Sequence, residues 1–138
     1  MSATLASVLA RDVPPGLFEW RGAVGTDIAG KGREAGWGVR ELDTRYVRDA
    51  GQLYEKMATT WDLPSWFGRN LDALWDVLGE LATSPLLVVW DGYAELAEVD
   101  PELAQTVLEL LRDASTQAAA LAVVVLDAPA LIGLDALL

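Results

Sequence analysis

Two uninterrupted apolar runs restrict the folds open to this chain more than any other feature. They extend from Leu86 to Trp90 and from Ala120 to Leu126. Runs without polar alternation are typical of parallel strands that are covered on both faces. A further strand is expected from Trp37 to Leu42, and helical patterns lie between the strands. Strand–helix–strand order implies right-handed crossovers, so we expect an α/β fold with a small three-stranded parallel sheet flanked by helices.

Three segments combine apolar residues at helical spacing with a capping residue. The first is expected from about Ala50 to Thr60, after Asp49. The second begins near Asn70. The third begins at Asp100-Pro101-Glu102, where the proline suits the first helical position. Tyr93 to Val99 fits either a loop or a short helix.

The first 37 residues carry weaker signals. Leu17 to Trp20 alternates loosely between apolar and polar side chains, and it could add an edge strand to the sheet. Residues 23–35 form a helical pattern interrupted by Gly25, Gly30 and Gly32, whose spacing fits neither a Walker A loop nor the dinucleotide fingerprint. We expect one domain over residues 1–138, made of an N-terminal extension (1–37), a core (38–127) and a C-terminal tail (128–138).

Charge and composition argue against several functions. The net charge is −11, and residues 51–138 hold fourteen acidic against three basic residues. Nucleic-acid phosphates would be repelled by this half, so we expect no direct nucleic-acid binding, while a basic partner would be attracted. The chain has no Cys and no His, which argues against zinc sites, thiolate chemistry and Ser-His-Asp catalysis. We expect no metal, no cofactor and no catalytic residue.

No segment is expected to enter a membrane. The apolar run from Ala118 to Leu126 is too short to span a bilayer, and residues 1–10 lack the basic start of a signal peptide. The absence of Cys suits a reducing compartment. We therefore expect a cytoplasmic protein that is a monomer when free.

The segment from Pro64 to Ala82 joins a loop rich in aromatic residues to an acidic helix. Apolar residues at helical spacing mark the buried face of this helix: Leu71, Leu74, Leu78, Leu81 and Ala82. Asp72 and Asp76 fall together on a face turned away from them, and Trp75 lies between the two faces. This pattern fits either an ordinary acidic helix start or a binding face for a cationic partner.

Residues 63–76 read Leu-Pro-Ser-Trp-Phe-Gly-Arg-Asn-Leu-Asp-Ala-Leu-Trp-Asp. They resemble the signature of the barstar family, whose members inhibit barnase-type ribonucleases inside the cell. The similarity extends from about Val39 to Leu126, and it implies a barstar-like fold and a partner that is a basic secreted ribonuclease. It also implies ten partner-binding residues: Trp66, Phe67, Gly68, Asn70, Leu71, Asp72, Trp75, Asp76, Gly79 and Glu102.

The resemblance assigns roles within this set. Asp76 matches the family's central acid, which enters the ribonuclease active site where substrate phosphate would sit. Asp72 matches a second acid that meets basic residues at the rim of the same cleft. Trp66 matches an aromatic residue that packs on the catalytic region, and Trp75 one that buttresses or lines the interface.

Three departures from the family pattern bear on the partner. Trp66 stands where the family typically has Tyr, so a phenolic hydrogen bond is lost. Arg69 stands where the prototype is acidic, which adds a positive charge at the rim. A further acid of the family, expected at the start of the next helix, has no clean counterpart, and Asp100 and Glu102 are the residues near it.

Three functions stay open at this point. The chain is either a proteinaceous ribonuclease inhibitor, or a barstar-type binding module for another basic toxin or protein, or an enzyme that uses Asp72 and Asp76 as an acid/base pair. The third is disfavoured, because nothing in the sequence marks a deep pocket and two acids at one helix start have little reason for different pKa values.

Overall fold

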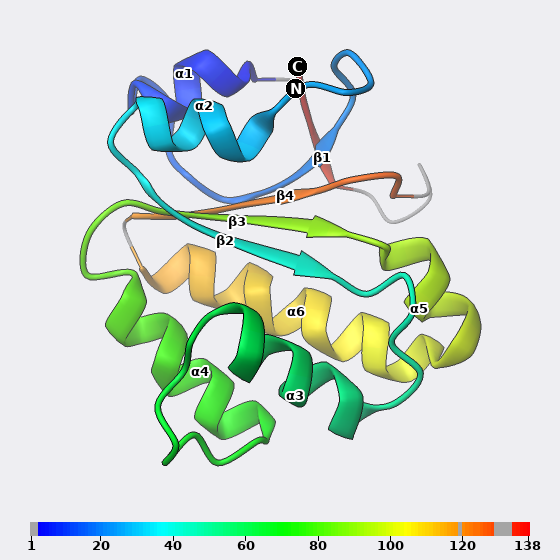
Figure 1. Ribbon diagram of the computed structural model, residues 1–138. Helices are drawn as coiled ribbons and strands as arrows, with labels where there is room; N and C mark the ends of the chain where they lie inside the picture. The colour runs from blue at the N-terminus through cyan, green and yellow to red at the C-terminus, as the bar shows by residue number, and fades with distance from the viewer. Residues whose placement is uncertain (1–2, 119, 129–133) are drawn as a thin grey trace.

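The computed structural model describes residues 3–118, 120–128 and 134–138. These residues contain five strands, which form one parallel sheet in the order β2-β3-β4-β1-β5 (Figure 1). The strands are β1 (Leu17–Trp20), β2 (Gly38–Asp43), β3 (Leu86–Asp91), β4 (Leu121–Val125) and β5 (Asp135–Leu137). The predicted α/β fold with a parallel sheet flanked by helices is confirmed, and β2, β3 and β4 are the three strands that the sequence predicts.

Helices cover both faces of this sheet (Figure 1). One face carries α1 (Leu5–Leu9) and α2 (Ile28–Glu34), and the other carries α3 (Ala50–Thr60), α4 (Leu71–Leu81) and α6 (Pro101–Gln117). The segment that fitted a loop or a helix forms α5 (Tyr93–Val99), which follows β3. None of the helices in the described parts of the chain has both the length and the apolar character needed to cross a bilayer.

The two central strands explain the continuous apolar runs. In β3, Leu86, Val88 and Trp90 pack with the core on the α3–α4–α6 side, whereas Leu87 and Val89 pack with the core on the α1–α2 side. Side chains alternate between the faces of a strand. A strand covered on both faces therefore needs an apolar residue at every position.

The N-terminal strand differs in its position from the expected edge strand. β1 pairs with β4 on one side, with Leu17 opposite Val123, and with β5 on the other, with Phe18 opposite Asp135. The C-terminal tail returns as β5 and takes the edge of the sheet instead. β1 therefore lies inside the sheet, hydrogen-bonded on both sides.

The predicted helix starts are confirmed by their capping bonds. The side chain of Asp49 accepts from the backbone N–H of Gln52 at 2.8 Å, and that of Asp100 accepts from the N–H of Leu103 at 3.1 Å. Each carboxylate satisfies one of the open amides in the first turn. Both helices then begin at the residue after the cap.

A buried turn joins β3 to α5 and holds it against the end of β2. Trp90 Nε1 donates to Thr44 Oγ1 at 2.9 Å, and that hydroxyl donates to the Gly92 carbonyl at 2.8 Å. Gly92 has φ 88°, a conformation that favours glycine. A Cβ on Gly92 would also collide with the backbone nitrogen of Arg45. Both the conformation and the close approach therefore require glycine here.

Gly92→Ala should destabilise the protein more than Gly36→Ala. Gly36 has a similar φ of 86°, but a Cβ there would meet no atom within 4 Å. We expect Gly36→Ala to lower the free energy of unfolding by about 1–2 kcal/mol through backbone strain alone, and Gly92→Ala to lower it by about 1 kcal/mol more through the collision. Urea unfolding of the two variants measures the difference, and equal losses would contradict the collision.

Candidate functional site

Helix α4 presents two carboxylates on its solvent-facing side. Leu74, Val77 and Leu78 are buried in the core, while Asp72 and Asp76 are exposed and Trp75 is half-buried. The predicted separation of an apolar and an acidic face is therefore confirmed, with Val77 added to the apolar one. Glu80 is also exposed one turn further along, so the acidic row extends over most of the helix.

The two adjacent aromatic residues of the preceding loop have different surroundings. Trp66 is 64% exposed, whereas Phe67 is 3% exposed. The Phe67 ring packs edge-on against Tyr54 of α3, with 6.4 Å between ring centroids. The sequence placed both residues in the partner-binding set. The structure places the Phe67 side chain in the core, where it fixes the loop instead of joining the exposed surface.

Asn70 connects the loop to the helix through both ends of its side chain. Its Oδ1 accepts from the backbone N–H of Ala73 at 2.8 Å, and its Nδ2 donates to the Gly68 carbonyl at 3.1 Å. The N-cap predicted from the sequence is thus confirmed. The second bond holds the loop at Gly68 against the first turn of α4.

Arg69 ties the same loop to α3. Its Nε donates to Glu55 Oε2 at 3.1 Å, and its φ is 51°, a conformation that is uncommon for a residue with a side chain. Both partners of this ion pair are exposed, so the pair contributes roughly 0–1 kcal/mol. The positive charge that the sequence adds at the rim therefore lies against an acidic partner within the chain.

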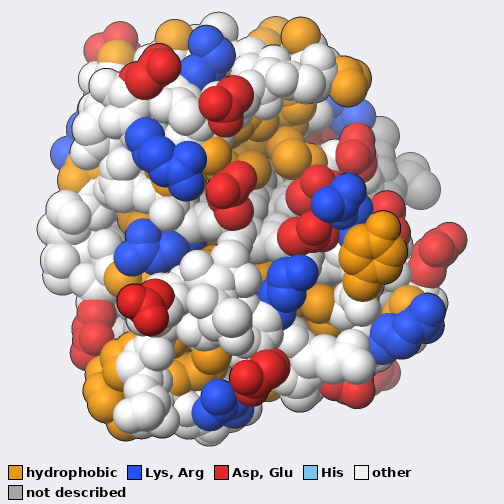
Figure 2. All heavy atoms as spheres, viewed as in Figure 1, with side chains coloured by type: hydrophobic (Ala, Val, Ile, Leu, Met, Phe, Trp, Pro, Cys, Tyr) orange, Lys and Arg blue, Asp and Glu red, His pale blue; other side chains and the backbone are white. Residues whose placement is uncertain are grey.

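Eight of the ten predicted binding residues lie along α4 and the loop before it with side chains or backbone at the surface. Exposed are Trp66, Gly68, Asn70, Asp72, Asp76 and Gly79, and half-buried are Leu71 and Trp75. Figure 2 shows hydrophobic side chains gathered at the lower left of the molecule, where Figure 1 has this loop and α4, with acidic side chains beside them. Phe67 and Glu102 are the two residues that the structure does not bring to this surface.

The sequence model of a family described as Barstar (barnase inhibitor) matches residues 37–126. The chain belongs to the Barstar family. A protein of Bacillus subtilis (strain 168), named "Putative ribonuclease inhibitor YrdF", is 30% identical over 76 residues, which cover 55% of this chain and 84% of that protein. The family match confirms the predicted extent of the resemblance. Of the secondary structure, α1, β1, α2 and β5 lie outside it.

Glu102 lies apart from the acids of α4. It is in the first turn of α6, and Figure 1 shows this turn beside α5, on the right, whereas α4 lies to the left. The sequence placed Glu102 in the binding set because the family's further acid was expected near a helix start. Because α4 packs against the other end of α6, Glu102 does not lie beside Asp76.

Asp113 is an acidic residue of α6 that the sequence analysis did not single out. Arg112 and Thr116 line a hollow beside β1, while Ala114 and Gln117 line a groove beside α4. Asp113 is exposed on α6, between Arg112, which lines the hollow, and Ala114, which lines the groove. Ala114 and Ala118, small residues four apart, are a sequence signal of this close helix contact.

The groove between α4 and α6 has a volume of about 290 Å³. Its lining comes from the second half of α4, the residues that follow it, and the last turns of α6: Trp75, Leu78, Gly79, Ala82, Thr83, Ala114, Gln117 and Ala118. Neither Asp72 nor Asp76 lines it.

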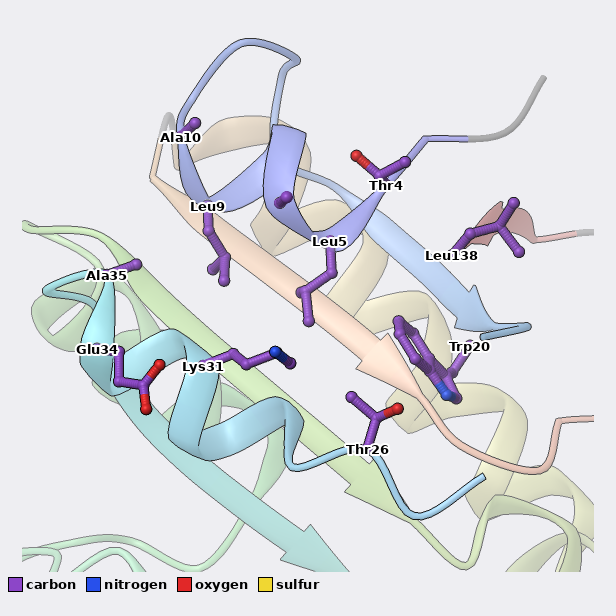
Figure 3. A pocket seen from close by; sticks show the side chains of 11 residues that line it. Thr4, Leu5, Leu9, Ala10, Trp20, Thr26, Lys31, Glu34, Ala35 and Leu138 are labelled. Atoms are coloured by element: carbon purple, nitrogen blue, oxygen red, sulfur yellow. The ribbon is translucent and has the colours of Figure 1, made fainter. Parts of the chain in front are cut away.

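A larger groove of about 680 Å³ lies on the α1–α2 side of the sheet (Figure 3). Leu5 and Leu9 of α1 point toward the strand below, and Lys31 of α2 extends across the groove toward Thr26. Every residue that lines it is outside the matched family region. The groove is separated by the sheet from Asp72 and Asp76, so neither groove encloses the two acids as the cleft of an acid/base enzyme would.

Two carboxylates at the ends of neighbouring strands have shifted pKa values. Hydrogen bonds from the Arg45 guanidinium, 2.7 and 3.0 Å long, hold the pKa of Asp43 below its usual value. Burial raises the pKa of Asp91, and the negative charges of Asp43 and Asp127 act in the same direction. These acids follow or end β2, β3 and β4. Among the described residues, no group of three or more acidic residues is placed to hold a metal ion.

Replacing each of the two loop aromatics by alanine should separate their roles. Phe67→Ala should lower the free energy of unfolding by about 3–5 kcal/mol, because it empties a buried site against Tyr54. Trp66→Ala should change it by less than about 0.5 kcal/mol, because most of that ring is already in water. Chemical denaturation measures both values. A large loss for Trp66→Ala would show that the ring is structural.

Proposed function

We propose that this chain inhibits a basic, secreted ribonuclease of barnase type by inserting the acidic face of α4 into its active site. The observation that carries the proposal is the pair of exposed carboxylates, Asp72 and Asp76, beside the exposed Trp66 on a member of the Barstar family. The chain itself then needs no catalytic group. A cytoplasmic location, where an intracellular inhibitor would act, is part of the same proposal.

The chemistry of the acids supports this role. A ribonuclease active site carries cationic side chains that bind the phosphate of RNA. A carboxylate can take the place of that phosphate through charge-assisted hydrogen bonds. Asp76 is assigned to the phosphate position and Asp72 to the rim. Trp66 supplies the large apolar contact that energetically dominant positions of protein interfaces prefer.

The surface is held in shape before any partner arrives. Asn70 binds both the loop and the helix, Phe67 anchors the loop in the core, and Arg69 connects it to α3. A loop that is already ordered loses less conformational freedom on binding. This organisation favours tight binding by a small surface.

The distribution of charge supports a basic partner. Residues 1–50 are balanced, with seven acidic and seven basic residues, so residues 51–138 account for the whole net charge of −11. α4 and α6 both lie in this acidic part. Such a field attracts a positively charged protein and accelerates its association.

Titration of the chain into an RNA-cleavage assay with a purified barnase-type ribonuclease should remove activity stoichiometrically. We expect the rate to fall linearly to an equivalence point, because a plugged active site cannot bind RNA. The chain alone should leave RNA intact, which serves as the control. If no ribonuclease of this class responds, the inhibitor assignment is wrong, and a barstar-type module for another basic toxin or protein takes its place.

Asp76→Ala should have opposite effects on stability and binding. The free energy of unfolding of the variant should equal that of the wild type or exceed it by a few tenths of a kcal/mol, because the change removes like-charge repulsion with Asp72. Its complex should be weaker by about 2–5 kcal/mol, a general range to which barnase–barstar itself contributed, because an enzyme cation would be left buried and unpaired. Calorimetry of the variant alone and with the ribonuclease measures both effects.

Glu95→Ala is the matched control for Asp76→Ala. Glu95 is also an exposed acid, but it lies on α5. Its removal changes the net charge by the same amount and should leave affinity within about 0.5 kcal/mol of the wild type. Equal losses for the two variants would show that total charge, and not the position of Asp76, determines binding.

A further inference from the structure

Nothing within the folded chain explains why residue 79 is a glycine. It lies inside α4, where glycine destabilises a helix relative to alanine. A glycine in a helix is usually explained by a positive φ or by a close neighbour that leaves no room for a side chain. Gly79 is absent from the residues with positive φ, and a Cβ built on it would meet no atom within 4 Å. Alanine would therefore fit this position and stabilise the helix.

The missing side chain of Gly79 opens the α4–α6 groove toward solvent. Gly79 is exposed and lines this groove of about 290 Å³. Leu78 and Ala82 of the α4 side and Ala114 and Ala118 of the α6 side give it apolar walls. Trp75 contributes to the same lining. The groove is therefore a small apolar hollow that continues the proposed inhibitory surface.

Acidic residues stand at the border of this hollow and not inside it. Asp76 precedes Gly79 by about one turn of α4, and Asp113 lies beside Ala114 on α6. Neither carboxylate belongs to the lining. An apolar centre with a charged rim is the usual anatomy of a strong contact between proteins.

We propose that the groove over Gly79 receives one aliphatic side chain of the ribonuclease, and that Gly79 is kept to leave room for it. This inference rests on the proposed function. The apolar lining suits an aliphatic group, while Asp76 and Asp113 would meet basic residues around it. A second copy of this chain is a poorer occupant, because it would bring the same acids against each other.

Gly79→Ala and Gly79→Leu test the groove, with Gly51→Ala as the matched control. Gly51 is also an exposed helical glycine, the second residue of α3, and a Cβ there would meet only the Asp49 carboxylate at 3.4 Å. Gly79→Ala should raise the melting temperature by about 3 °C, and Gly51→Ala, in the first turn of α3, should raise it by less. Only the Gly79 variants should weaken inhibition. Gly79→Leu should bind the ribonuclease more weakly than the wild type, on the order of tenfold or more, because its side chain fills the groove.

The outcomes separate this inference from the proposed function. If the wild type inhibits and Gly79→Leu inhibits equally well, the groove lies outside the interface and the inference fails, while the proposed function stands. If the wild type inhibits no barnase-type ribonuclease, the proposed function fails and takes the inference with it. A wild-type dimer in analytical ultracentrifugation that Gly79→Leu abolishes would also overturn the inference, because it would assign the groove to a second copy.

Discussion

The burial of β3 and β4 on both faces is the constraint on which the rest of the structure depends. Each of these strands carries apolar side chains on both faces of the sheet. The chain must therefore supply a layer of helices to cover each face. The matched family region supplies α3, α4 and α6 to one side. The cover on the other side comes from α1 and α2, which lie outside that region. The N-terminal extension is therefore part of the core, since Ile28 and Ala29 belong to the same buried cluster as Leu87 and Val124.

The position of α4 follows from the same constraint. The helix buries Leu74, Val77 and Leu78 against the α3–α4–α6 core, which fixes its rotation about its own axis. Asp72 and Asp76 must then point to solvent, because residues on the opposite side of a helix cannot also reach the sheet. Packing in the core thus determines which side chains a partner can meet.

Local signals predicted most of this fold, and non-local pairing accounts for what they missed. Asp49, Asn70 and Asp100 identify three helix starts because a cap acts within four residues. The place of β1 inside the sheet depends on β5, only three residues long, whose pairing partner is more than a hundred residues away in sequence. The different fates of Trp66 and Phe67 depend on Tyr54 of another helix, and Ala114 shares a groove with α4 only through helix packing. These contacts join residues that are distant in sequence, so no short segment of the chain predicts them.

The solvent-facing side of α4 destabilises the helix, and burial of the inner side offsets this loss of stability. Like charges one turn apart destabilise a helix by a few tenths of a kcal/mol per pair, and an interior glycine by about 1 kcal/mol. Asp72, Asp76 and Glu80 form two such pairs, and Gly79 adds the glycine term. Burial of one large apolar side chain contributes roughly 1.5–3 kcal/mol, and α4 fully buries Leu74 and Leu78. Those two residues alone outweigh the outer face. Helix α4 can therefore keep an acidic, glycine-containing surface that stability by itself would not favour, which is the expected mark of a surface selected for a partner.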